Sequence, residues 1–137
     1  MATWAVDAFG NDYAQDWAED LGQISNLEAV ENTLDMALEN AGETLDAPFA
    51  AEALVAIEVL ARLQGKGGAR SEDSAAVDAW VDARKAKARV RSDLAEKAGR
   101  AIERILSEQS ELRELWEESE HYQEWLASVD DLRTRLG

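Results

Sequence analysis

The stretch Ala47–Leu63, APFAAEALVAIEVLARL, is apolar almost all the way round a helix, and only Glu52, Glu58 and Arg62 interrupt it. A helix without a wide polar face is normally buried on most of its sides. A helix of this length spans roughly 25 Å, about the width of a small domain. We therefore predict a central helix over residues 47–63, with the rest of the chain packed around it.

The segments on both sides of this stretch have amphipathic patterns and helix-capping residues at their starts. Asn11, Ser25, Asp46, Ser92 and Ser110 are the expected caps, because short polar side chains bond the exposed N–H groups of a first turn. Besides the central helix, we predict helices over 12–21, 27–40, 71–85, 92–106, 110–116 and 122–136, with Ala76, Val77, Trp80 and Ala83 facing inward in the fourth. No stretch alternates like a β-strand.

The length of 137 residues favours a single domain over 1–137, large enough to bury a core without disulfides or metals. The predicted fold is all-α, a compact bundle of about six to seven helices. The absence of cysteine fits a reducing compartment. The N-terminus lacks the pattern of a signal peptide, and charges interrupt the longest apolar stretch. We therefore expect a cytoplasmic protein with no membrane span.

The net charge of −15 is unevenly distributed along the sequence. Residues 1–61 contain 13 acids and no Lys or Arg, residues 62–104 carry a net charge of +4, and residues 105–137 carry −6. Contacts to nucleic-acid phosphates require clustered Lys and Arg, so direct nucleic-acid binding is not expected. The acidic surface has two interpretations, ordinary solubility or attraction of a basic protein.

Two short segments resemble binding motifs without matching them. Residues 64–70, QGKGGAR, are predicted to form a loop, but they lack the full phosphate-loop spacing and follow a helix instead of a strand. Residues 84–91, RKAKARVR, carry five bases but no interleaved aromatic residue. We interpret this basic run as a solvated segment that pairs with the acidic N-terminal half, and a patch for nucleic acid or an anionic ligand is the alternative.

The side chains needed for metal or nucleophilic chemistry are nearly absent. His121 is the sole histidine, and the spacing from Glu118 to His121 occurs once, whereas di-iron bundles use that motif twice. Without cysteine, a structural zinc site is not expected. No serine has the sequence context of a nucleophile elbow. The sequence therefore predicts no catalytic residue, no metal ligand and no cofactor.

The N-terminal seventeen residues carry a pattern that we recognise. The pattern is G-x-W-G-x-G-x-F-D-N-D-x-A-x-D-W, and the matching residues are Trp4, Phe9, Asn11, Asp12, Ala14, Asp16 and Trp17. Ala2, Ala5 and Asp7 stand where the pattern has glycine, and Gly10 stands where it has aspartate. With the segments AAEALVAIEVLA and SELRELW, the chain resembles the bacterial domain of unknown function numbered 4259. The resemblance implies a small helical bacterial protein and implies no activity.

Two classes of function remain open at this point. The first is a non-enzymatic interaction protein, immunity- or inhibitor-like, that binds a basic partner by electrostatically steered association. Its expected partner-binding residues are Asp12, Asp16, Glu31, Asp35 and Glu39. The alternative is a small enzyme acting through carboxylates near Asp12 and Asp16. The scarcity of His and Cys favours the binding protein.

Overall fold

The computed structural model describes residues 5–23, 27–39, 43–68, 70–84, 90 and 92–136. These residues contain seven helices and no strand, which confirms the predicted all-α bundle. The helices are α1 (Asp12–Leu21), α2 (Glu28–Leu38), α3 (Ala47–Leu63), α4 (Ala75–Arg84), α5 (Ser92–Ile105), α6 (Glu111–Glu117) and α7 (Tyr122–Leu136).

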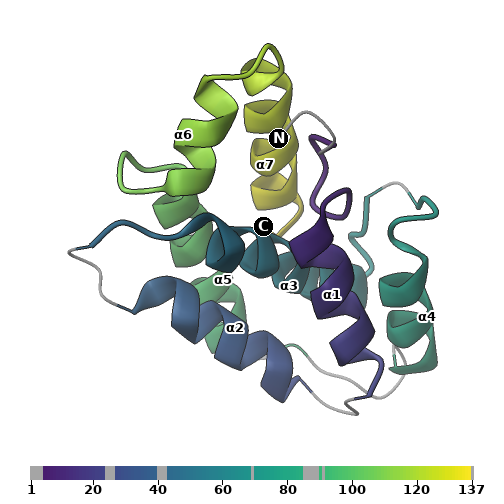
Figure 1. The fold of residues 1–137 in the computed structure, drawn as a ribbon. Coiled ribbons are helices and arrows are strands. Elements are labelled where there is room, and N and C mark those ends of the chain that lie inside the picture. The colour runs from purple at the N-terminus through teal and green to yellow at the C-terminus, as the bar shows by residue number, and fades with distance from the viewer. Residues whose placement is uncertain are drawn as a thin grey trace.

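Helix α3 lies at the centre of the bundle, as its sequence predicts. It contacts every other helix, and residues 53–63 of α3 are all buried. Figure 1 shows α3 crossing the middle of the molecule, with α6 and α7 above it, α2 below it and α4 at one side. The apolar stripes of the outer helices close over α3, so burial of this one helix organises the core.

The helix starts show two confirmed caps and one wrong prediction. The side chains of Asn11 and Ser110 accept hydrogen bonds from the amides of Ala14 and Arg113, as expected of caps. Asp46 precedes α3 but forms no such bond. Instead, Glu111 Oε1 accepts a hydrogen bond of 2.7 Å from the Ala47 amide. The expected caps of α2 (Ser25) and α5 (Ser92) are not observed as caps, because Ser25 lies outside the described residues and Ser92 is the first residue of α5.

A short backbone pairing places Glu111 at the start of α3. The Leu45 amide donates to the Gln109 carbonyl at 2.7 Å, and the Leu45 carbonyl accepts from the Glu111 amide at 3.0 Å. This isolated bridge holds the segment before α3 against the segment before α6. The first turn of α3 therefore receives its carboxylate from a helix far away in sequence, which no local pattern could reveal.

Helix α4 starts later than predicted, at Ala75 and not at residue 71. The reason is a turn in which the Ser71 amide donates to Ser74 Oγ at 2.9 Å and the Ser74 amide donates back to Ser71 Oγ at 3.3 Å. Of the four predicted inward residues, Val77 and Trp80 are buried, whereas Ala76 and Ala83 are exposed. They fall off the stripe that Val77 and Trp80 form with Val81.

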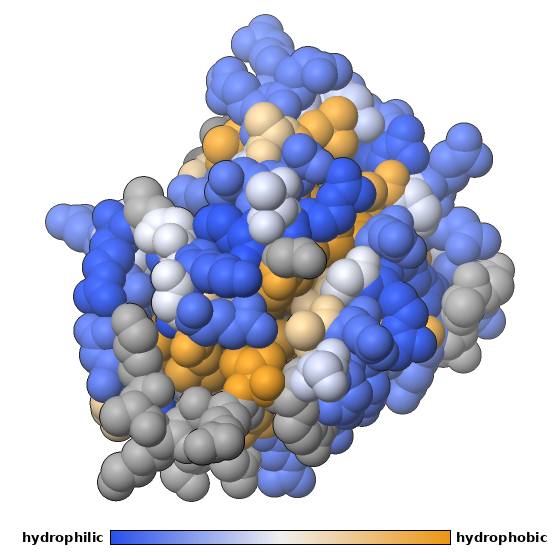
Figure 2. All heavy atoms as spheres, turned by 180° about the vertical axis from the view of Figure 1, so that it is seen from behind, coloured by the Kyte–Doolittle hydropathy of each residue, from blue (hydrophilic) through white to orange (hydrophobic). Residues whose placement is uncertain are grey.

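The surface is largely polar. Figure 2 shows the side opposite to Figure 1, where hydrophilic residues predominate and hydrophobic residues form a strip across the middle. No helix of the described residues is long and apolar enough to cross a membrane.

Candidate functional site

The described part of the N-terminal sequence motif has structural roles that can be read from its contacts. The Asp7 carboxylate accepts hydrogen bonds from the Phe9 and Gly10 amides at 2.8 and 2.9 Å, which shapes the turn before α1. Phe9 is buried, and the Arg62 guanidinium lies 4.8 Å from the centre of its ring. The side-chain amide of Gln15 donates to the Phe9 carbonyl at 2.8 Å. These contacts fix the N-terminal segment on α3.

Trp17 continues this pattern further along α1. Its indole N–H donates a hydrogen bond of 2.8 Å to the Thr33 hydroxyl, and that hydroxyl donates to the Ala29 carbonyl. Because both partners are in α2, Trp17 joins the two N-terminal helices through a satisfied polar contact in an otherwise apolar interface. The motif residues Phe9, Asn11 and Trp17 therefore each have a role in holding the fold together. The motif residues Asp12 and Asp16, in contrast, are exposed to solvent.

The five predicted partner-binding carboxylates lie on α1, on α2 and at the residue that follows α2, and both helices face the viewer in Figure 1. Asp12, Asp16 and Glu39 are exposed and form no ion pair with another described residue. Asp35 differs, because its carboxylate accepts a bond of 2.7 Å from Lys97 Nζ of α5. That hydrogen bond is the main cause that raises the pKa of Lys97, and Glu31 adds to the effect. The structure thus splits the predicted set into unpaired and paired members.

Negative charge also gathers between α1 and α3. Burial of its carboxyl group raises the pKa of Glu52, and the nearby Asp20 carboxylate raises it further. Both effects disfavour the charged form of Glu52, and only the second of them is repulsion between charges.

A small pocket opens where α2 ends and α3 begins. Its volume is about 190 Å³, and its apolar lining consists of Met36, Leu45 and Phe49. Met36 is 46% exposed and Phe49 is half-buried, so both are accessible from solvent. The polar part of the lining consists of Thr44, Arg104, Glu39, Glu43 and Asp46. We call this feature the α2–α3 pocket.

Arg104 of α5 holds one wall of the α2–α3 pocket in place. Its guanidinium donates to the carbonyls of Ala37, Glu39 and Glu43 at 3.0, 2.5 and 2.9 Å. A cation is favourable at this position because the C-terminus of a helix carries partial negative charge. The carboxylates of Glu39, Glu43 and Asp46, in contrast, form no ion pair with another described residue.

A buried ion network, which the sequence analysis did not predict, joins α3, α4 and α7. Glu58 pairs with Arg62 one turn further along α3, and Glu58 Oε1 also accepts a bond of 2.7 Å from Arg135. Arg62 Nε donates to Asp78 of α4 at 2.8 Å, and the Ser74 hydroxyl donates to the same carboxylate at 2.7 Å. Glu58, Arg62 and Asp78 are all buried. The one feature of the sequence that could have indicated this network is the i, i+4 spacing of Glu58 and Arg62 within an apolar helix.

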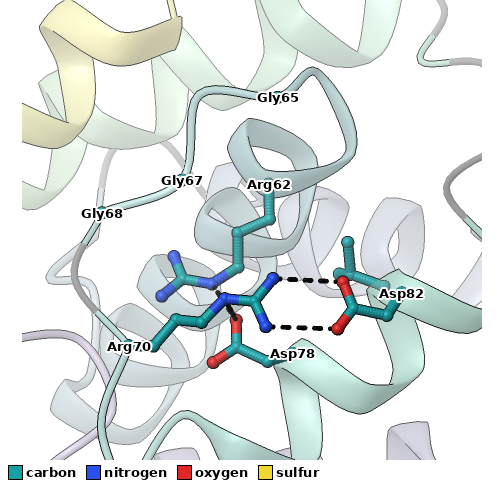
Figure 3. A pocket seen from close by; sticks show the side chains of 8 residues that line it. Arg62, Gly65, Gly67, Gly68, Arg70, Asp78 and Asp82 are labelled. Carbon is teal, nitrogen blue, oxygen red and sulfur yellow. Dashed lines mark hydrogen bonds and ion pairs between the residues drawn. The ribbon is translucent and has the colours of Figure 1, made fainter.

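The glycine-containing loop after α3 passes beside this network, as Figure 3 shows. It lines a pocket of about 170 Å³ together with Arg62, Arg70, Asp78 and Asp82. Arg70 donates to both carboxylate oxygens of Asp82 at 3.1 and 3.2 Å. Two cations and two anions therefore balance in the pocket, which leaves no excess positive charge for a phosphate group.

This loop also shows why small residues are present at its sharpest positions. Gly65 has a positive φ of 77°, which only glycine adopts readily. A β-carbon at Gly67 would lie 2.7 Å from Cγ of Arg62. Gly65 thus permits the turn of the backbone, and Gly67 permits the close passage of the loop over Arg62.

The carboxylates of the enzymatic alternative, Asp12 and Asp16, are both exposed residues of α1. Asp12 and Asp16 line neither of the two pockets described above. His121 is exposed, and its Nδ1 lies 3.4 Å from a carboxylate oxygen of Glu124. Within the described part of the chain, no three or more His, Cys, Asp or Glu side chains are grouped so that they could hold a metal ion. Of the basic run 84–91, Arg84 stacks on Trp80 at 4.5 Å, and residues 85–89 and 91 lie outside the description.

Together these features define a small all-α domain with an acidic N-terminal surface and a buried ion network that joins α3, α4 and α7. The model of the family described as a domain of unknown function (DUF4259) matches residues 2–128, so the chain belongs to this family. Neither a curated protein nor a solved structure matches the chain.

Proposed function

We propose that the protein is a non-enzymatic binding protein whose acidic N-terminal half attracts a basic partner protein, in the manner of an immunity or inhibitor protein. The observation that carries the proposal is a set of exposed carboxylates on α1 and at the end of α2, namely Asp12, Asp16 and Glu39, which have no ion-pair partner among the described residues. Binding of a cationic surface would release the repulsion between these charges.

Several cations of the described residues are directed to groups other than Asp12, Asp16 and Glu39. Among the described contacts, Lys97 pairs with Asp35, whereas Arg62 and Arg135 are directed to the buried Glu58. Arg104 donates to backbone carbonyls at the end of α2. The negative potential over α1 and α2 therefore supports fast, salt-sensitive association with a cationic surface. A cytoplasmic location and the absence of direct nucleic-acid contacts are part of the same proposal.

The experiment is an affinity capture from the extract of the source cell at low salt, followed by measurement of association rates. The test variant carries Asp16→Lys and Glu39→Lys, two exposed positions without ion pairs to described residues. Asp35 is left unchanged, because its reversal would place a second cation beside Lys97. We expect a basic protein that binds the parent and associates more slowly as salt rises or when the variant is used.

A matched control distinguishes an effect of the α1–α2 surface from an effect of the net charge of the protein. Glu118→Lys and Glu120→Lys change the net charge by the same amount at exposed positions next to α6, away from α2. This control should associate nearly as fast as the parent. Equal slowing in both variants, or an association rate that does not respond to salt, would show that the α1–α2 surface is only a solvated face.

A further inference from the structure

The α2–α3 pocket combines solvent-accessible apolar side chains with an acidic rim. Met36 and Phe49 supply the apolar part, and Met36 is the more exposed of the two large hydrophobic residues that are exposed in the described chain, at 46% against 38% for Tyr13. Methionine is flexible and adapts to different contact shapes, so it is common on binding surfaces. An accessible methionine beside a half-buried phenyl ring is therefore a suitable contact for a partner side chain.

The volume of the pocket limits what it can hold. At about 190 Å³ it is smaller than the roughly 300–1,000 Å³ of typical small-molecule sites, so a single long side chain fits better than a metabolite. The charge of the lining selects the kind of side chain. The lining contains three acidic residues, Glu39, Glu43 and Asp46, against one arginine, which already donates to three backbone carbonyls. The lining is thus complementary to a cation.

We propose that the α2–α3 pocket receives an arginine side chain of the basic partner. The aliphatic stem would lie against Met36, the planar guanidinium would stack on Phe49, and the carboxylate rim would accept its N–H groups. Arginine suits the site better than lysine, because its flat, weakly hydrated group both stacks on aromatic rings and bonds carboxylates in pairs. This inference rests on the proposed function and names the pocket in which one side chain of the basic partner would bind.

The test uses a fluorescein-labelled peptide of nine arginines, with a peptide of nine lysines for comparison, at low salt. The chain has two methionines, so ¹³C labelling of methionine methyl groups gives a Met36 signal that Met36→Leu identifies. We expect the arginine peptide to shift this signal more than the lysine peptide does. Met36→Ser and Phe49→Leu keep every charge and should each weaken the arginine peptide by about two- to fivefold in fluorescence anisotropy.

Controls keep the result independent of folding and of general charge attraction. Tyr13→Ser removes the other exposed large hydrophobic of the described chain and should leave the peptide affinity unchanged. Thermal melting checks Phe49→Leu, and Met36→Ser supplies the same test at a more exposed position. Peptide binding that neither shifts the Met36 signal nor weakens in these variants would overturn the pocket while leaving the acidic-surface proposal intact. Equal effects of both peptides on Met36 would overturn the choice of arginine.

Discussion

Ala5 and Gly10 approach each other so closely that a β-carbon on residue 10 would lie 2.4 Å from the Ala5 β-carbon. The Ala5 amide also donates a hydrogen bond of 2.9 Å to the Gly10 carbonyl, so the backbone holds the two residues together. In the family pattern the smaller and the larger residue are exchanged: glycine stands at position 5 and aspartate at position 10. The contact explains why the larger residue at one position goes with glycine at the other.

Gly10→Ala should therefore destabilise the domain, and Ala5→Gly in the same chain should restore most of the loss. Overpacking of this kind costs about 1–3 kcal/mol, and the two changes should couple because they occupy one contact. Urea unfolding of the parent, both single variants and the double variant measures the coupling. Additive effects of the two substitutions would mean that the turn relaxes around the added methyl group.

Arg135 should contribute far more to stability than Arg133 of the same helix. Arg135 bonds the buried Glu58, whereas Arg133 pairs with Asp130 on the surface. Removal of one partner from a buried pair typically costs about 3–5 kcal/mol, while an exposed pair is worth about 0–1 kcal/mol. Since Arg62 still bonds Glu58 in Arg135→Met, we expect a loss toward the lower end of that range. Arg133→Met is the matched control, and equal melting of the two variants would contradict a structural role for the network.

Much of this fold follows from local sequence patterns, and the exceptions have a common cause. The central helix, the caps Asn11 and Ser110 and the inward Trp80 depend on residues close in sequence, so periodicity and capping rules find them. Glu111 at the start of α3 and Arg135 at Glu58 come from 64 and 77 residues away. Such partners depend on tertiary packing, which a single sequence does not specify.

The candidate site divides in the same way. That Asp12 and Asp16 are exposed agrees with the amphipathic pattern of α1. The pairing of Asp35 with Lys97 was not predictable, because it depends on how α5 lies against α2. The α2–α3 pocket likewise requires Met36, Phe49 and Arg104 from three helices, so its existence became visible only in three dimensions.

Ile57→Asp should unfold the domain or cost several kcal/mol. Ile57 is fully buried in α3, and an aspartate there would bring an unpaired charge into the core. Ala127→Asp, at an exposed position of α7, is the control and should cost less than about 1 kcal/mol. Circular dichroism melts compare the variants. A parental melting temperature for Ile57→Asp would contradict the central position of α3.

Glu52→Gln should stabilise the protein at neutral pH and lose this advantage in acid. Burial first, and the Asp20 carboxylate second, raise the pKa of Glu52 above its ordinary value of 4.5. Between the unfolded and the folded pKa the folded state binds more protons, so the free energy of unfolding falls as pH rises through that window. Above the folded pKa the penalty is fully present, and below pH 4.5 it disappears. Urea midpoints at pH 7 and pH 4 for parent and variant measure this penalty.

Asp20→Asn should give a smaller gain in stability of the same sign, since it removes the weaker cause of the raised pKa of Glu52. Glu19→Gln removes one exposed charge from the same helix as Asp20, so a gain of equal size there would assign the effect to net charge and not to Glu52.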